Sequence, residues 1–335
     1  MNRFEATWLS QIRSRGDGVQ DCRVLVACSG GGDSTALLLL LWAVRKSLGL
    51  ELIVAHANHG LRTEAWEDAA FVASMCRGLD LDCSEATLDV RGHALRTGQG
   101  LETAGRDLRW AWLKAEAASC GANFIATGHT RDDHTETVLL RLARGGGAKA
   151  LTPLPARQDP RWSPLIEARR EQLRAYVTQH GLQWREDPSN DQDFTPRNRW
   201  RKLLEPMRQE SPALDQHLWE THLQVAELVA LRDAQVEAWR GPRWSLAEEP
   251  SRLLLRGTWR EGELRWVLEA AFKAMDWHRE AGLLRDLSTW LLPHLTRRSR
   301  KPKGWGGWKL EFADDCWSLR RNPVGQEPLD PRAHS

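Results

Sequence analysis

Arg23 to Thr35, RVLVACSGGGDST, is the stretch that decides the fold of this chain. Residues 23–28 are rich in valine and leucine, which is typical of a short strand buried on both faces of a sheet. The apolar segment at residues 36–48 is too long for one strand, so we expect a helix that begins at about Asp33 or Ser34. The sequence therefore predicts a strand, a glycine loop and a helix in succession.

Three consecutive glycines, Gly30, Gly31 and Gly32, join this strand to the helix. A backbone without Cβ atoms can turn sharply and approach a ligand closely, and the first amides of the helix point outward unpaired. These donors and the helix dipole make a site for an anion such as phosphate. The loop has neither the lysine of G-x-x-x-x-G-K-[ST] nor the spacing of G-x-G-x-x-G, so both common nucleotide-binding motifs are excluded.

The polar groups of this loop are Ser29, Asp33 and Ser34. The two hydroxyls can bind phosphate oxygens, and Asp33 can hold the Mg²⁺ that a loop without lysine would need for charge neutralisation. The alternative is a plain glycine-rich turn in which Ser34 is only the N-cap of the helix.

Length and composition indicate a globular protein of two domains. The chain has 335 residues, of which 41% are hydrophobic and 27% charged, and this length exceeds the usual size of one domain. A net charge of +2 does not by itself indicate a nucleic-acid binder. The six cysteines are scattered without a C-x-x-C pair, and no apolar run approaches the roughly 18 residues of a membrane span. We therefore expect a cytoplasmic protein with reduced thiols.

Strands alternate with helices through the first half of the chain. Further strands are predicted at residues 51–59, 81–90 and 122–127, and helices at 64–79, 101–119 and 130–143. This alternation predicts an α/β fold with a doubly wound parallel sheet. His56 falls at the end of its strand, where open sheets of this kind bind ligands.

The second half of the chain has a different pattern. An acidic linker at residues 186–190 indicates that the first domain ends nearby, and we predict domains at 1–206 and 207–322 and a disordered tail at 323–335. The second domain is expected to be smaller and mainly helical, with amphipathic runs at 213–239 and 264–277. It closes with a basic hairpin whose strands are predicted at residues 308–312 and 316–320.

A second polar constellation, TGHTRDDHTET, spans residues 127–137. If a helix begins near Thr130, Asp133 and Glu136 lie one turn apart on one face, close to the carboxyl edge of the sheet and to the Ser29 loop. Two carboxylates on one face can bind an ammonium ion or a metal. The alternative is that Thr130 and Asp133 form a capping box and that the acids favour the helix dipole.

Together these segments resemble one family, the tRNA(Ile)-lysidine synthetases of the PP-loop group of N-type ATP pyrophosphatases. The motifs that carry the resemblance are SGGGDS at 29–34, HANHGLR at 56–62, Glu102-x-x-x-Arg106-x-x-Arg109-Trp110, TGHTRDDHTETVLLRLARG at 127–145, and EDPSN at 186–190 with Arg197-Asn198-Arg199. The match runs over residues 22–206, and the chain looks like a short form of the family. The resemblance implies a PP-loop, adenine nucleotide α-hydrolase-like catalytic domain at 1–206 and a tRNA-binding domain at 207–322.

The activity implied by the resemblance is an ATP-dependent ligation. The family modifies the wobble cytidine in the CAU anticodon of an isoleucine tRNA, so that the tRNA reads AUA. ATP adenylates the C2 oxygen of that base with release of pyrophosphate, and the ε-amine of free lysine displaces AMP to give lysidine. The implied partners are this tRNA and free L-lysine, and a homodimer is a further expectation from the family.

The resemblance also implies roles for single residues. Ser29, Gly30, Gly31, Gly32, Asp33 and Ser34 would hold ATP, with Asp33 on Mg²⁺ and His56 bordering the adenine. Asp133 and Glu136 would meet the amino groups of lysine, and Arg109 would lie near its carboxylate or near the phosphates. Arg197 would order a loop over the active site; alternatively, Arg197, Arg199 and Arg201 face solvent or pair with nearby acids.

Two further features bear on this interpretation. Ser163 stands before Pro-Leu where the family often has arginine, and His134 and Thr135 stand where Gln-Ala is frequent and are expected to face away from the site. The basic run at residues 297–303, beside Trp305, Trp308 and Trp317, is expected to contact tRNA phosphates rather than to stack bases. The rival functions are a tRNA thiolation enzyme, which the missing C-x-x-C disfavours, and a non-catalytic tRNA-binding protein, which the intact polar residues disfavour.

Overall fold

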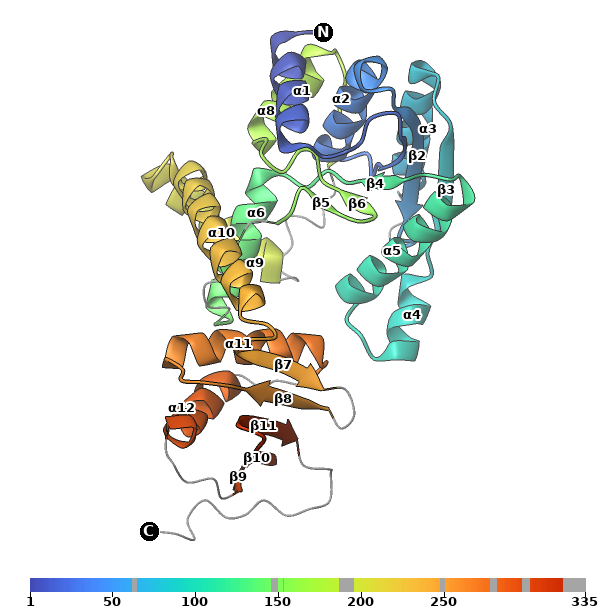
Figure 1. The fold of residues 1–335 in the computed structure, drawn as a ribbon. Helices are drawn as coiled ribbons and strands as arrows, with labels where there is room; N and C mark the ends of the chain where they lie inside the picture. The colour runs from blue at the N-terminus through green and yellow to red at the C-terminus, as the bar shows by residue number, and fades with distance from the viewer. Residues whose placement is uncertain are drawn as a thin grey trace. The chain divides into compact units, whose positions relative to one another are not determined.

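The computed structural model describes residues 1–61, 65–145, 150–152, 154–186, 196–247, 251–277, 282–296 and 302–321. Figure 1 shows their helices and strands. The chain divides into two compact units, Met1–Ala226 and Glu227–Ser335. Among the described residues, no helix is both long enough and apolar enough to cross a membrane.

The first unit is built on a six-stranded sheet with the strand order β3-β2-β1-β4-β6-β5. Its strands are β1 (Arg23–Ala27), β2 (Glu51–Asn58), β3 (Cys83–Thr87), β4 (Phe124–Ala126), β5 (Arg157–Gln158) and β6 (Arg161–Trp162). Every neighbouring pair from β3 to β6 is parallel, and β5 is an antiparallel strand at the edge. The predicted doubly wound α/β fold is confirmed.

Helices cover both faces of this sheet (Figure 1). Side chains of α1 (Arg3–Arg15), α2 (Gly32–Leu48), α3 (Ala65–Leu79) and α8 (Arg170–Gln179) share one core with Val24 and Val26 of β1. The opposite face, which carries Leu25 of β1 and Ile125 of β4, is covered by α5 (Leu101–Ser119), and α5 also contacts α4 (Val90–Thr97). Alternate residues of β1 therefore point into two separate cores, as expected for a strand buried on both sides.

The strand order places a topological switch point beside β1. The chain leaves β1 for α2 and β2 on one side, whereas β4 pairs with β1 on the other side and leads into α6 (Arg131–Ala143). Ala27 pairs with Ala55 of β2, and Val26 pairs with Ala126 of β4, so these strands end at the same edge. Ligands of open α/β sheets bind in the crevice that such an edge creates.

Two helices extend the first unit beyond the predicted boundary at residue 206. That residue falls within α9 (Pro196–Glu210), which contacts α6, and α10 (Leu214–Ala238) continues across the division at residue 226. Ion pairs of Arg208 with Asp132 and Asp215 link the end of α9 and the start of α10 to α6. The two compact units divide at residue 226, within α10, and the domain boundary at residue 206 remains a prediction.

The second unit contains a five-stranded antiparallel sheet with the order β7-β8-β11-β10-β9. Its strands are β7 (Trp244–Ala247), β8 (Arg252–Leu255), β9 (Lys303–Trp305), β10 (Trp308–Ala313) and β11 (Cys316–Arg321), and its helices are α11 (Glu261–Ala274) and α12 (Leu283–Thr296). The two amphipathic runs and the hairpin are confirmed, since α10, α11, β10 and β11 occupy them. The sequence pattern did not indicate β7 and β8, so the unit has more strand than expected.

The tryptophans of the hairpin belong to the core of this unit. Trp308 and Trp317 are buried at 3% and 5% exposure and pack with Trp244 and Phe272. This burial supports the expectation that these rings do not stack bases. Of the basic run, residues 297–301 lie outside the described residues, as does the predicted tail at 323–335.

Candidate active site

The glycine loop forms a tight turn at the start of α2. Gly30 adopts a φ of 85°, which favours glycine, and Gly31 is the N-cap of the helix without a side-chain hydrogen bond. The Ser34 Oγ atom accepts the Ser29 amide at 3.2 Å, donates to the Gly31 carbonyl at 3.0 Å and lies 3.1 Å from the Ser29 Oγ atom. Ser34 is therefore not the plain N-cap of the alternative reading, because its hydroxyl closes the loop from inside the helix.

Two neighbouring segments approach the loop closely. A Cβ atom built on Gly128, after β4, would lie 3.2 Å from the backbone carbon of Asp33 and the amide nitrogen of Ser34. On the other side, a Cβ atom on Gly32 would lie 3.4 Å from the Trp184 ring. The Arg185 amide donates to the Gly30 carbonyl at 2.9 Å. Residues 184–185 thus form a strap against the loop, which the sequence did not indicate.

The first turn of α6 carries the predicted carboxylates. Thr130 caps this helix, and the Asp133 carboxylate accepts the Thr130 amide at 2.9 Å, so the capping box is present. Asp133 and Glu136 are both buried, and Glu136 is 0% exposed. The capping box occupies one oxygen of Asp133, Oδ2, and the other oxygen faces an arginine.

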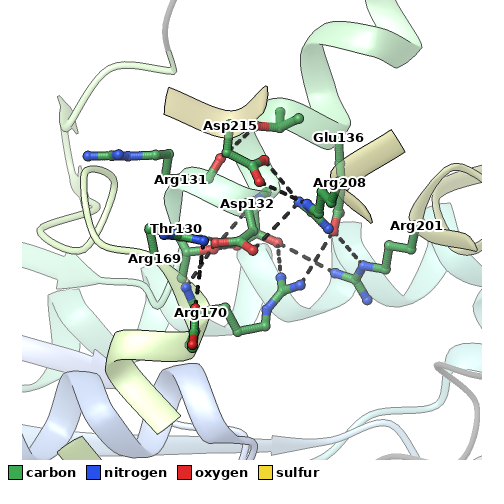
Figure 2. A network of polar contacts seen from close by, with 12 residues as sticks. Thr130, Arg131, Asp132, Glu136, Arg169, Arg170, Arg201, Arg208 and Asp215 are labelled. Atoms are coloured by element: carbon green, nitrogen blue, oxygen red, sulfur yellow. Dashed lines mark hydrogen bonds and ion pairs between the residues drawn. The ribbon is translucent and has the colours of Figure 1, made fainter. Parts of the chain in front are cut away.

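Arg170 joins the loop to these carboxylates, and Figure 2 shows it in one polar network with Glu136 and Arg201. Its guanidinium donates from Nε to the Asp33 Oδ2 atom at 3.1 Å and from Nη2 to the Asp133 Oδ1 atom at 3.0 Å. Its Nη1 atom lies 3.6 Å from the Glu136 Oε1 atom. One partly buried cation therefore connects Asp33 of the glycine loop to Asp133 and Glu136, which brings the two predicted constellations together.

Arg201 of α9 completes the cluster from the other side. Its Nε atom donates to the Glu136 Oε1 atom at 2.7 Å, and its Nη2 atom lies 3.5 Å from the Asp133 Oδ1 atom. The alternative that this arginine pairs with acids is confirmed, although the acids are the site carboxylates. Asp132 also takes part, since its Oδ2 atom accepts the Arg170 amide at 2.9 Å.

Sequence reasoning gave no role to Arg170, Asp132 or Trp184. One signal was available for Arg170: Arg169 and Arg170 stand together at the start of α8, where the helix dipole disfavours cations. Two arginines at that position indicate acids from elsewhere in the chain. No local pattern indicates which acids these are.

The environment of Asp33 fits a metal ligand. Burial raises the pKa of the Asp33 carboxyl, and the charge of Arg170 opposes this effect. Within the described part of the chain, its Oδ1 atom is buried without a hydrogen-bond partner. The described residues include no cluster of three or more acidic, histidine or cysteine groups that could enclose a metal. A cation at Asp33 would therefore need most of its ligands from phosphate and water oxygens.

His56 is buried at the end of β2, at 4% exposure. Its Nδ1 atom lies 2.9 Å from the Cys28 carbonyl, so Nδ1 carries the proton. In the neutral ring the Nε2 atom is then an acceptor, and it is buried without a partner among the described residues. His56 thus contacts Cys28, the residue that directly precedes the loop.

The structure does not join the other two predicted arginines to this cluster by a described contact. Arg109 is half-buried on α5, the helix that covers the opposite face of the sheet from α2. Arg197 lies in the first turn of α9, and its side chain is outside the described residues. The roles expected of Arg109 and Arg197 remain predictions.

Two residues that depart from the family pattern have defined positions. Ser163 is buried, and its hydroxyl lies 3.0 Å from the Thr127 Oγ1 atom, which in turn lies 2.8 Å from the His129 Nδ1 atom. His134 does not face solvent but is 1% exposed, with its ring centroid 4.1 Å from that of His222. Burial lowers the pKa of His134 to about 3, so it is a neutral core residue.

Comparisons with known proteins identify the family of this chain. A family model described as a PP-loop domain matches residues 4–208. The chain is 41% identical to a tRNA(Ile)-lysidine synthase of Nitratidesulfovibrio vulgaris over 61% of its length and 61% of the relative's. It is 36% identical to the tRNA(Ile)-lysidine synthase of Deinococcus radiodurans over 84% of its length and 46% of the relative's. The chain thus spans less than two thirds of the length of these curated relatives.

A solved structure with a similar fold is a U34-tRNA thiolase from Methanococcus maripaludis, which holds a [4Fe-4S] cluster. Its TM-score is 0.56 at 16% sequence identity, and the match covers 67% of this chain and 80% of that one. This likeness concerns the fold alone. The matched family model covers more than half of the chain and includes the glycine loop, the carboxylates and Arg170, and the chain therefore belongs to the PP-loop family.

Proposed function

We propose that this chain is an ATP-dependent ligase that joins lysine to the C2 position of the wobble cytidine in the CAU anticodon of an isoleucine tRNA. The names of its relatives support this proposal, as does one geometric observation. Arg170 contacts both Asp33 of the glycine loop and the Asp133 and Glu136 carboxylates. A nucleotide site and a cation site therefore adjoin each other, as a two-step ligation needs.

In the first step, the loop holds the phosphates of ATP. The amides of the first turn of α2 and the Ser29 and Ser34 hydroxyls offer donors to the β- and γ-phosphates, and the His56 Nε2 atom offers an acceptor to the adenine amine. The C2 oxygen of cytidine attacks the α-phosphate, and pyrophosphate leaves. Adenylation converts a poor leaving oxygen into a good one.

Mg²⁺ would be held by Asp33, whose buried Oδ1 atom is without a partner among the described residues. When bound, it supplies charge neutralisation at the phosphates. Arg170, with Nε 3.1 Å from Asp33 Oδ2, is the described cation that can stabilise charge developing on the phosphates. Arg109 and Arg197 are further candidates, as the family resemblance implies.

In the second step, the ε-amine of lysine attacks C2 and AMP leaves. Asp133 and Glu136 lie in a buried environment, where carboxylates interact strongly with an ammonium group. A carboxylate in contact with the amine can also accept its proton, which frees the lone pair that attacks. We assign lysine selection to these two residues.

The tRNA partner and a homodimer are proposed from the relatives and the family resemblance. The rival function is a tRNA thiolation enzyme, and the cysteines of this chain argue against it. All six cysteines are free, and although Cys76 and Cys83 contact each other, no group of three or more described cysteine, histidine and acidic side chains could hold a metal.

The proposal is tested with purified chain, ATP, radiolabelled lysine, and two tRNA transcripts that differ only in the anticodon, CAU or a control. We expect label on the CAU transcript alone, and at least 100-fold less label with the Asp33→Ala variant. A protein that binds ATP but leaves the CAU transcript unlabelled would contradict the proposal. Full labelling by the Asp33→Ala variant would remove the assignment of Mg²⁺ to Asp33.

A further inference from the structure

Arg170 occupies positions that two substrates of the proposed reaction require. On one side it covers the Oδ2 atom of Asp33, beside the phosphate loop. On the other side it donates at 3.0 Å to the Asp133 Oδ1 atom, and it lies 3.6 Å from the Glu136 Oε1 atom. Because the capping box uses Asp133 Oδ2, an incoming ammonium ion would need Asp133 Oδ1, which Arg170 contacts at 3.0 Å and Arg201 more loosely at 3.5 Å.

The backbone of Arg170 is fixed, whereas its side chain has alternatives. The amide donates to Asp132 at 2.9 Å, and the helix that Arg170 begins, α8, shares a core with α2 through Leu173 and Val177. The side chain is 20% exposed, and the guanidinium lies at its long, flexible end. A rotation of the side chain can therefore move the cation without moving the helix.

ATP supplies a competing partner for this cation. Phosphate oxygens bound at the amides of α2 would lie beside Asp33, and a guanidinium pairs with phosphate through two parallel hydrogen bonds. Asp133 and Glu136 offer Arg170 single contacts at 3.0 and 3.6 Å. A triphosphate carries more charge than either carboxylate, so an occupied loop draws the guanidinium toward itself.

We propose that Arg170 sets the order of substrate binding. With the loop empty, it fills the ammonium site at Asp133 and Glu136; with ATP bound, it moves onto the phosphates and opens that site to lysine. The proposal rests on the function proposed above. Its consequence is that lysine affinity depends on the nucleotide.

The test measures lysine binding to the full chain by isothermal titration calorimetry, with and without the non-hydrolysable α,β-methylene analogue of ATP and Mg²⁺. For the unchanged protein we expect the analogue to lower the Kd of lysine at least tenfold. For Arg170→Gln we expect the two Kd values to agree within twofold. The matched control is Arg169→Gln, which removes the neighbouring, exposed arginine and should retain the nucleotide effect.

Arg170→Lys serves as a second variant in case Asp33, Asp133 and Glu136 do not tolerate the loss of one of their two cations, Arg170 and Arg201. A lysine ammonium cannot form the two parallel hydrogen bonds that a guanidinium makes with phosphate. The ATP analogue should therefore lower the Kd of lysine less in this variant than in the unchanged protein. A full nucleotide effect in Arg170→Gln, or in Arg170→Lys if the first variant is unfolded, would overturn the proposal. Nucleotide-independent lysine binding by the unchanged protein would overturn the ordering alone. No lysine binding by any protein in either condition would contradict the ligase function and the ordering together.

Discussion

Gly128→Ala is a small change that tests how closely the two halves of the site must fit. The added Cβ atom would lie 3.2 Å from the Asp33 carbon and the Ser34 nitrogen, both of which are backbone atoms. Carbon contacts prefer about 3.5–4.0 Å, so the start of α2 and the segment after β4 must separate by roughly 0.4 Å. Overpacking of this kind costs about 1–3 kcal/mol of stability.

The expected loss of activity follows from the same displacement. Misplacement of a site by about 1 Å can reduce the rate about 100-fold, so a shift of roughly 0.4 Å should lower kcat/KM for tRNA lysylation about five- to tenfold. The matched control is Gly78→Ala in α3, where an added Cβ atom meets nothing within 4 Å and should be neutral or stabilising. If Gly128→Ala had kcat/KM within twofold of the unchanged protein and the same Tm, a close fit between these two segments would not be required.

Three further changes follow from single contacts. Trp184→Ala removes the ring beside Gly32, and we expect KM for ATP to rise about tenfold; an unchanged KM would contradict a role for the strap. In the folded protein, burial keeps His134 neutral by lowering its pKa to about 3. In the unfolded chain, the same histidine binds a proton below about pH 6.5. Protonation of the unfolded state therefore lowers the free energy of unfolding progressively as the pH falls from about 6.5 toward 3. For His134→Gln, urea titrations should show a smaller loss of unfolding free energy between pH 7 and 5.5, by up to about 1.4 kcal/mol, and equal losses would refute this assignment. Arg201→Ala removes the 2.7 Å hydrogen bond with buried Glu136, which keeps Arg170 at 3.6 Å, and should cost about 1.5–3 kcal/mol of stability. A loss below about 0.5 kcal/mol would contradict a stabilising role for this pair.

The fold was predictable because its signals are local. The valine- and leucine-rich strand, the three glycines and the long apolar helix determine β1, the loop and α2, and the alternation that follows determines a parallel sheet. Asp133 and Glu136 were placed near the loop because carboxyl ends of parallel strands share one edge. The sheet of the second unit was underestimated, because β7 and β8 have four residues each and short apolar runs do not separate strand from helix.

The contacts that join the site were not predictable in the same way. Arg170 reaches Asp33 across 137 positions in the sequence, and Arg201 reaches Glu136 across 65. Such pairs depend on tertiary packing of α8 and α9, and arginine can pair with any acid within reach. His134, which was expected to face away from the site, is buried against His222, and its partner, far along the chain, could not be identified from the sequence.

In the proposed reaction, the glycine loop holds the ATP that activates cytidine, and the α6 carboxylates bind lysine. The most direct test follows transfer of α-³²P label from ATP to the CAU transcript by a Glu136→Gln variant in the presence of lysine. Glu136 is fully buried, and its Oε1 atom accepts from Arg201. We expect adenylated tRNA to accumulate with the Glu136→Gln variant, while lysine incorporation falls at least 100-fold. Wild-type lysine incorporation, or the absence of adenylated tRNA in a folded variant that binds ATP, would contradict these roles.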